Sequence, residues 1–139
     1  MIKISFDFDD TFSLEKVQKL SIFLSEHKPY IEQWIVTERF SEDSKKMLHD
    51  AQNLNIDNQD IFEIAKKINI PKYRIVFTNS KRKKDFFKNK DFLIHIDNCE
   101  HELNLIRAET KTLTINVNTE KFDEKLLKFL EYIETRSKI

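Results

Sequence analysis

The chain contains no glycine, although a usage of roughly 7% would supply about ten in a chain of this length. Glycine lets the backbone approach a phosphate group closely, so its absence excludes a P-loop and a dinucleotide-binding fingerprint. A phosphate-handling protein of this composition must use side chains, a metal ion and helix N-termini instead. Left-handed turns must be served by Asn, Asp or Lys, and Asn residues are numerous.

The charge balance and the single cysteine exclude several classes of partner and site. Lys plus Arg and Asp plus Glu both number 24, so no net charge attracts the protein to nucleic acid or to an anionic membrane. Cys99 alone cannot form an internal disulfide or a cysteine-based zinc site, which fits a reducing compartment. Because no apolar run is long enough for a signal peptide or a membrane span, we expect a soluble, cytoplasmic protein.

Short apolar runs alternate with longer helical patterns, which is typical of a parallel sheet covered by helices. We therefore predict an α/β fold of three Rossmann-like layers, with a five-stranded parallel sheet and helices on both faces. The expected strands are residues 2–6, 34–36, 73–77, 92–96 and 113–117.

The clearest helix is predicted for residues 60–69. Its apolar positions follow the i, i+3, i+4, i+7 spacing, at Ile61, Ile64, Ala65 and Ile68. Asn58 or Asp57 can cap its start, and Pro71 follows its end. Similar stripes predict a first helix within residues 14–24 and a last helix within residues 122–133.

The segment of residues 41–55 has polar residues and weak periodicity, so it fits either a short helix or a long loop. No repeat, low-complexity tract or proline-rich linker marks the beginning of a second domain. We expect one domain over residues 1–139, with at most a small lid within residues 38–57.

An apolar strand directly precedes the sequence Asp7-Phe8-Asp9-Asp10-Thr11. In an extended chain the side-chain period is two, so Asp7 and Asp9 are expected to project to the same side beyond the strand. Adjacent carboxylates repel, and a hard divalent cation such as Mg²⁺ is the simplest way to keep them together. An Asp-x-Asp pair alone is weak evidence, because it also occurs by chance and at metal-nucleotide sites of sugar transferases.

Later strands also end in polar side chains. Thr37, after the second strand, carries a hydroxyl that can bind a phosphoryl oxygen, and Asp97, after the fourth, adds a carboxylate. The basic run of residues 81–84 lies between them and can neutralise phosphoryl charge. Since ligands of open α/β sheets bind outside the carboxyl ends of the strands, these segments are expected to meet in one crevice.

This order resembles the four-motif pattern of the haloacid-dehalogenase-like hydrolases, and in particular small, nearly capless phage and bacterial members. The resemblance covers nearly the whole chain. It implies the nucleophile, the general acid and base, the second-motif hydroxyl and the fourth-motif metal ligand, at Asp7, Asp9, Thr37 and Asp97 respectively. For the third-motif lysine, the spacing from residues 78–79 favours Lys83, with Lys81 and Lys84 close behind.

The resemblance also implies a Mg²⁺ site with Asp7, Asp9, Asp97 and Asn98 as its ligands. In the family a second acid usually stands beside or near the fourth-motif aspartate, whereas here the neighbour is Asn98, a neutral or water-mediated ligand. Glu100 or Glu102 could compensate for the missing charge. The residue after Asp9 is often glycine in the family and is Asp10 here.

The implied activity is that of a magnesium-dependent phosphatase that forms an aspartyl-phosphate. A phosphorylated small molecule, such as a nucleotide or a sugar phosphate, is the expected substrate, and a nucleic-acid end is the other candidate. A nearly capless member has an open site or borrows a lid from a second subunit. The alternative is a non-catalytic module that binds phosphate or nucleic acid, because relatives of such folds can lose turnover. Neither substrate identity nor oligomeric state is predicted.

Three further features near the motifs have more than one interpretation. The basic run, with Phe86 and Phe87, could stack on nucleic-acid bases, but a solvated helix face with both rings packed inward is the commoner arrangement. His95 lies inside an apolar strand and is expected to be a hydrogen-bonded core residue. Cys99 is expected to be a small buried residue.

Overall fold

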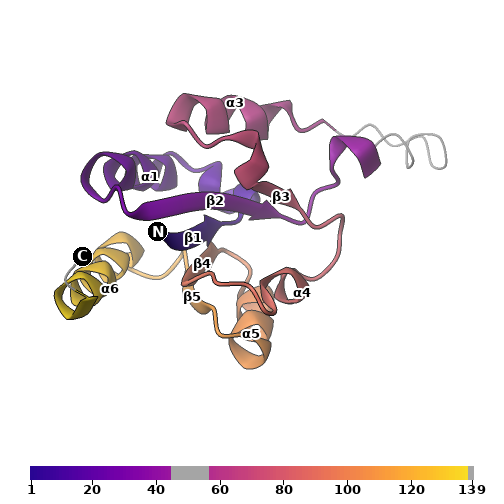
Figure 1. Cartoon of the computed structure of the whole chain (residues 1–139). Coiled ribbons are helices and arrows are strands. Elements are labelled where there is room, and N and C mark those ends of the chain that lie inside the picture. Colours follow the sequence, from indigo (N-terminus) through magenta and orange to yellow (C-terminus); the bar gives the residue numbers. More distant parts are fainter. Residues whose placement is uncertain (45–56, 138–139) are drawn as a thin grey trace.

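The computed structural model describes residues 1–44 and 57–137. Its centre is a five-stranded, all-parallel sheet with the strand order β3-β2-β1-β4-β5. Helices cover both sides of this sheet, with α1 and α3 on one side and α4 and α5 on the other (Figure 1). The predicted α/β class and its three Rossmann-like layers are therefore confirmed.

The strands lie close to the predicted segments, with differences at their ends. They are β1 (Ile2–Phe6), β2 (Ile31–Thr37), β3 (Ile75–Phe77), β4 (Ile94–Asp97) and β5 (Leu113–Asn116). The prediction placed the start of β3 at residue 73, which is wrong because Lys72–Arg74 forms a short 3₁₀ turn after Pro71. The start of β2 was predicted too late, since polar Glu32 and Gln33 hid the first half of this strand.

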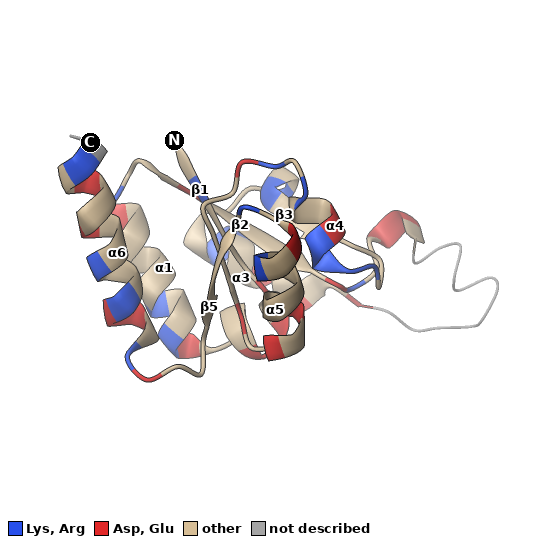
Figure 2. Ribbon diagram, turned by 90° about the horizontal axis from the view of Figure 1, so that it is seen from below, with Lys and Arg blue, Asp and Glu red and all other residues tan. Residues whose placement is uncertain are grey.

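The helices are α1 (Glu15–His27), α3 (Gln59–Ile68), α4 (Lys83–Phe87), α5 (Glu100–Glu109) and α6 (Phe122–Ser137). None of the helices in the described ranges is both long and apolar enough to cross a membrane. Both signs of charge alternate along α6, as the balanced composition leads one to expect (Figure 2). Residues 45–56, which include most of the undecided segment and of the lid predicted within residues 38–57, lie outside the described residues.

Two apolar clusters hold the layers together. The larger one joins α1, α3 and α6 to the sheet through residues such as Leu24, Ile61 and Leu126, and the smaller one joins α4 and α5 through Phe87 and Ile106. Neighbouring residues of one central strand serve opposite faces, since Ile35 belongs to the first cluster and Val36 to the second. A strand buried on both faces must be apolar at successive positions, which explains its short, uninterrupted apolar run.

The left-handed positions show how the chain folds without glycine. Within residues 1–44 and 57–137, the residues with positive φ are Asp10, Asn69, Asn79, Ser80, Asn89 and Lys121. The prediction that Asn, Asp or Lys would serve these turns is confirmed for all but Ser80. At the end of α3, Asn69 has φ 70°, and the N–H of Ile70 donates to the carbonyl of Ala65 at 2.8 Å, which closes the helix.

Replacement of Asn69 tests the strain at this turn. Asn69→Ala should lower the free energy of unfolding by about 1 kcal/mol, because a Cβ without a compensating polar group is disfavoured in the left-handed region. Asn69→Gly, the matched control, should leave the stability equal or slightly higher. Urea denaturation of the three proteins measures this, and equal stability of the Ala and Gly variants would contradict it.

Candidate active site

A pocket of about 290 Å³ opens beyond the carboxyl ends of β1, β2 and β4. All six residues predicted for the site line it, namely Asp7, Asp9, Thr37, Lys83, Asp97 and Asn98. Five further residues line it, namely Asp10, Glu38, Arg39, Cys99 and Glu102. Of these, the sequence analysis named Asp10, Cys99 and Glu102 near the motifs. The segments that carry the motifs therefore meet at one place.

The sheet brings the two deepest carboxylates together. Asp7 directly follows β1, and its N–H donates to the carbonyl of Ile96 in β4 at 2.8 Å. Asp97 is the last residue of β4, and the register pairs Phe6 with Ile96, so the next residue of each strand lies at the same edge. Thr37 ends β2 on the other side of β1 and is buried, with its Oγ1 accepting from the N–H of Arg39 at 3.3 Å.

Lys83 bridges the two carboxylates. Its Nζ lies 2.8 Å from Oδ1 of Asp7 and 2.6 Å from Oδ2 of Asp97, and only 3% of its side chain is exposed. Lys84 instead pairs with Glu109 on the outer surface, and Lys81 is exposed. Of the three lysines that the spacing allowed, Lys83 is thus the one that reaches the pocket.

Asp97 is fully enclosed by hydrogen-bond donors. Besides Lys83, it accepts from the N–H groups of Asn98 and Cys99 at 2.8 and 3.0 Å and contacts Nε2 of His95 at 2.9 Å. Burial alone would raise the pKa of Asp97, but the hydrogen bond from His95 and the charge of Lys83 outweigh it and hold this pKa below its ordinary value. Asp97 is therefore ionised at neutral pH.

His95 supports Asp97 from inside the sheet. It is fully buried, and burial lowers its pKa, so the ring is neutral at pH 7 and has one N–H. If that hydrogen is on Nε2 it donates to ionised Asp97, and Nδ1 then accepts from the hydroxyl of Ser5 at 2.8 Å. The expectation of a hydrogen-bonded core histidine is confirmed.

Asp7 differs from Asp97 in its protonation. Burial raises the pKa of Asp7 from 3.8 to about 7, because the attraction of Lys83 is opposed by the negative charge of Asp97. Two carboxylates around one lysine thus titrate far apart, as is common where one site contains both an acid and a base.

Asp9 has a different partner from Asp7. Its carboxylate accepts two hydrogen bonds from Arg39, at 2.6 and 3.0 Å, and the same guanidinium binds Asp60 of α3 at 2.7 and 3.0 Å. Both carboxylates nevertheless line the same pocket. Asp9 keeps an extended backbone (φ −65°, ψ 129°), and the next residue, Asp10, is left-handed (φ 55°), so the chain turns directly after Asp9.

An oxygen-rich corner lies beside Asp7. Turned so that its nitrogen faces this corner, the Asn98 amide donates to Oδ2 of Asp7 at 3.1 Å, to Oδ1 of Asp97 at 3.2 Å and to the backbone carbonyl of Asp9 at 3.2 Å. With the opposite amide orientation, four oxygens face one another, which is the donor set that a hard cation such as Mg²⁺ takes. Among the residues that the structure describes, however, no group of three His, Cys, Asp or Glu side chains is arranged to hold a metal.

The second-acid candidates differ in where they lie. Glu100 binds Arg107 and Asn116 at the surface and does not line the pocket, whereas Glu102 is buried at 2% exposure and does. Oε1 of Glu102 accepts from Arg82 at 3.3 Å. A hydrogen bond to Glu102, aided by burial, raises the pKa of Glu38 to about 7. Glu102 and Glu38 thus form a carboxyl pair in one wall of the pocket.

The sequence analysis missed Arg39 and Glu38 as site residues. The available signal was their position directly after Thr37 at the end of a strand. It is a weak signal, because charged residues commonly follow a strand and their partners, Asp9 and Glu102, lie far away in the chain.

Two expectations about the surroundings have clear outcomes. Phe87 is buried and Phe86 half-buried, and both rings pack against Phe92 at centroid distances of 5.4 and 5.6 Å, so neither is free to stack on bases.

Cys99 is exposed, contrary to the prediction, because it precedes the first turn of α5 at the rim of the pocket.

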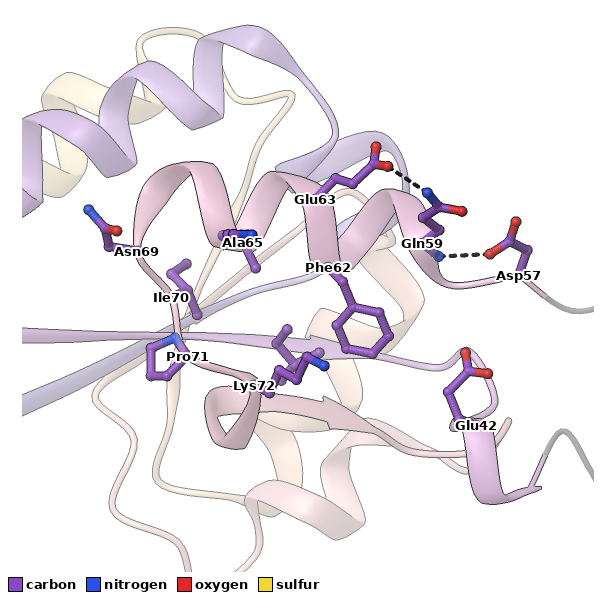
Figure 3. Close-up of a pocket in the computed structure, with 12 residues that line it drawn as sticks. Glu42, Asp57, Gln59, Phe62, Glu63, Ala65, Asn69, Ile70, Pro71 and Lys72 are labelled. Carbon is purple, nitrogen blue, oxygen red and sulfur yellow. Dashed lines mark hydrogen bonds between the residues drawn. The ribbon is translucent and has the colours of Figure 1, made fainter.

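A larger groove, of about 770 Å³, runs along α3 on another part of the molecule. Figure 3 shows Phe62, Ile70 and Pro71 on its apolar side, with Glu63 and Gln59 hydrogen-bonded to each other at its rim. Asp7, Lys83 and Asp97 are not among its lining residues. Size alone therefore does not indicate the reactive site of this protein.

The titration of Asp7 predicts a pH-dependent stability. In EDTA, the folded protein keeps the Asp7 proton between about pH 4 and pH 7, where the unfolded chain has released it. The contribution of Asp7 therefore makes the free energy of unfolding fall as the pH rises through this window, by up to about 1.4 kcal/mol per pH unit. Asp7→Asn should be more stable relative to wild type at pH 8 than at pH 5.

Urea denaturation at both pH values measures this difference. Asp10→Asn is the matched control, because it removes an exposed carboxylate of the same loop and should keep the wild-type dependence on pH. Parallel pH profiles of Asp7→Asn and wild type would show that Asp7 ionises normally in the fold.

Removal of the Lys83 charge should be costly at neutral pH. Lys83→Met leaves buried Asp97 without its cation, and we expect the free energy of unfolding at pH 7.5 to fall by about 3–5 kcal/mol. Lys81→Met, an exposed neighbour, should change it by less than about 0.5 kcal/mol. Equal stability of the two variants in urea denaturation would rule out a structural role for the Lys83 bridge.

No protein-family model matches this chain, and no curated protein or solved structure gives a significant match. The functional assignment therefore rests on the contacts of the described residues.

Proposed function

We propose that the protein is a magnesium-dependent phosphatase of the haloacid-dehalogenase-like type, which hydrolyses a phosphomonoester through an aspartyl-phosphate on Asp7. The observation that supports this most strongly is the bridge from Lys83 to Asp7 and Asp97 at the carboxyl edge of the sheet. It combines a reactive carboxylate, a fixed positive charge and a second carboxylate in one pocket, which are the groups that phosphoryl transfer needs.

Asp7 is a better nucleophile candidate than Asp97. Asp97 has no exposed surface and is surrounded by four donors, so its oxygens are engaged. The side chain of Asp7 keeps 10% of its surface exposed within the pocket, and its Oδ1 accepts from Lys83 at 2.8 Å. A phosphorus atom can therefore approach Asp7 and not Asp97.

Asp7, Asp97, the backbone carbonyl of Asp9 and the amide oxygen of Asn98 would hold Mg²⁺. When bound, the ion would supply positive charge that favours ionised carboxylates and offsets the charge of the phosphoryl group. Of the two orientations of the Asn98 amide, the one with its oxygen toward the corner would serve the ion, so Asn98 would be a neutral ligand.

In the first half-reaction, an ionised oxygen of Asp7 attacks the phosphorus in line with the leaving oxygen. The new bond joins Asp7 to phosphorus, the bond to the leaving group breaks, and Asp9 donates a proton to the departing oxygen. Lys83 and the hydroxyl of Thr37 would hold the equatorial oxygens, and the presence of both in the lining beside Asp7 supports this role.

In the second half-reaction, Asp9 accepts a proton from water, which attacks the phosphorus. The bond between Asp7 and phosphorus breaks, so inorganic phosphate and the free carboxylate are produced. Asp9 can carry this proton only if it exchanges at least part of its pairing with Arg39, since a bidentate guanidinium favours the ionised carboxylate. The incoming phosphate is a natural competitor for that guanidinium.

Phosphate release tests the proposal directly. Wild-type protein with Mg²⁺ should release phosphate from at least one member of a panel of phosphomonoesters that includes p-nitrophenyl phosphate, and EDTA should abolish the activity. Asp7→Asn should reduce turnover to background because the amide is not a nucleophile. Asp10→Asn should keep wild-type turnover.

Wild-type turnover by Asp7→Asn would refute the role of Asp7. Binding of phosphomonoesters without turnover by any protein of the set would favour the non-catalytic phosphate-binding alternative.

A further inference from the structure

One wall of the pocket has a buried oxygen that lacks a donor. Glu102 is 2% exposed, and its Oε2 has no hydrogen-bond partner among the residues that the structure describes. Oε1 of the same carboxylate is bound by Arg82. A buried acceptor without a donor is costly, so a native structure that retains one usually has an external partner for it.

Glu38 forms the other half of this wall. It directly follows Thr37 at the end of β2, while Glu102 lies in the first turn of α5, and both line the pocket with Asp7 and Lys83. A hydrogen bond joins Glu38 to Glu102 only while one of the two carboxyls holds a proton, and with a pKa of about 7 Glu38 loses that proton above neutral pH. Together with Oε2 of Glu102, the ionised pair can accept hydrogen bonds from a group that enters the pocket.

The charges of the pocket restrict what that group can be. Six carboxylates line it, at residues 7, 9, 10, 38, 97 and 102, against the two cationic side chains of Arg39 and Lys83. Arg82 pairs with Glu102 from outside the lining, and Asp7 and Glu38 are ionised fully only above neutral pH. Above neutral pH the carboxylates of the lining outnumber its cationic side chains. A leaving group that carries a further phosphate or carboxylate would be repelled at this wall, as like charges disfavour a partner.

We infer that Glu38 and Glu102 form the leaving-group subsite of the proposed phosphatase, and that this subsite takes a small phosphomonoester whose leaving group offers hydrogen-bond donors and no additional anion. Polyol and sugar phosphates supply such donors as hydroxyl groups, and amino-alcohol phosphates supply them as an ammonium group. Nucleic-acid ends are disfavoured, because their neighbouring phosphates would face the acidic wall. The inference rests on the proposed function for the reaction and on the wall geometry for the preference.

Matched substrates separate the effect of the leaving group from that of the phosphate. Glycerol 1-phosphate and propyl phosphate differ only in two hydroxyl groups, phosphoethanolamine offers an ammonium group, and 3-phosphoglycerate adds a carboxylate. We expect wild-type kcat/KM to be at least about tenfold higher for glycerol 1-phosphate or phosphoethanolamine than for propyl phosphate, because the donors pair with charged acceptors. A 5′-phosphorylated oligonucleotide and 3-phosphoglycerate should be poorer than glycerol 1-phosphate.

Variants of Glu38 assign the preference to the wall. Glu38→Ala should reduce the preference for the donor-bearing substrates, measured as the ratio of their kcat/KM to that of propyl phosphate within the same variant, to about twofold or less. Glu38→Gln keeps an acceptor at the same place and should retain part of the preference, which separates lost recognition from lost folding. Asp10→Asn, which removes another lining carboxylate, should keep the preference.

Binding keeps the test independent of turnover. Calorimetry with full-length Asp7→Asn protein in Mg²⁺ should show tighter binding of glycerol 1-phosphate than of propyl phosphate, and Glu38→Ala in the same background should remove the difference. This result would support the subsite even if the wild-type protein released no phosphate. Equal affinity and equal turnover for the two esters, or a preference that Glu38→Ala leaves intact, would overturn the subsite while leaving a phosphatase in place.

Discussion

The buried bridge from Lys83 to Asp7 and Asp97 is the interaction on which the pocket depends. Three titratable groups could not be held this close without at least one opposite charge, because desolvation of like charges is expensive. The lysine comes from the first residue of α4 and the carboxylates from the ends of β1 and β4, so this contact also fixes α4 against the sheet edge.

The surroundings of the bridge give the two carboxylates different roles. Asp97 accepts from several donors, and its pKa is lowered, so it is ionised. Asp7 has fewer donors and a pKa raised to about 7, so its ionisation near neutral pH depends on the charges around it. At the rim, Arg39 binds both oxygens of Asp9, whereas Oε2 of Glu102 has no donor among the described residues. The carboxylates of the pocket thus differ in how fully they are hydrogen-bonded.

The lack of glycine limits how the proposed phosphatase could bind phosphate. No glycine loop can wrap an anion, and left-handed positions before the basic run are taken by Asn79 and Ser80. Under the proposed function, phosphate would therefore be bound by side chains at the strand ends and by a cation. The pocket has such charged side chains in its lining.

The sequence by itself determined the fold class, the approximate strands and the segments that end at one edge of the sheet. The reason is that apolar periodicity and the succession of strands and helices can be read along the chain. The motif spacing of the family that the chain resembles also favoured Lys83. Only the tertiary structure decided that Lys83 binds Asp7 and Asp97, that Arg39 binds Asp9 and Asp60, and that Glu38 meets Glu102. These contacts join residues 14 to 76 positions apart, and no local pattern encodes such pairings.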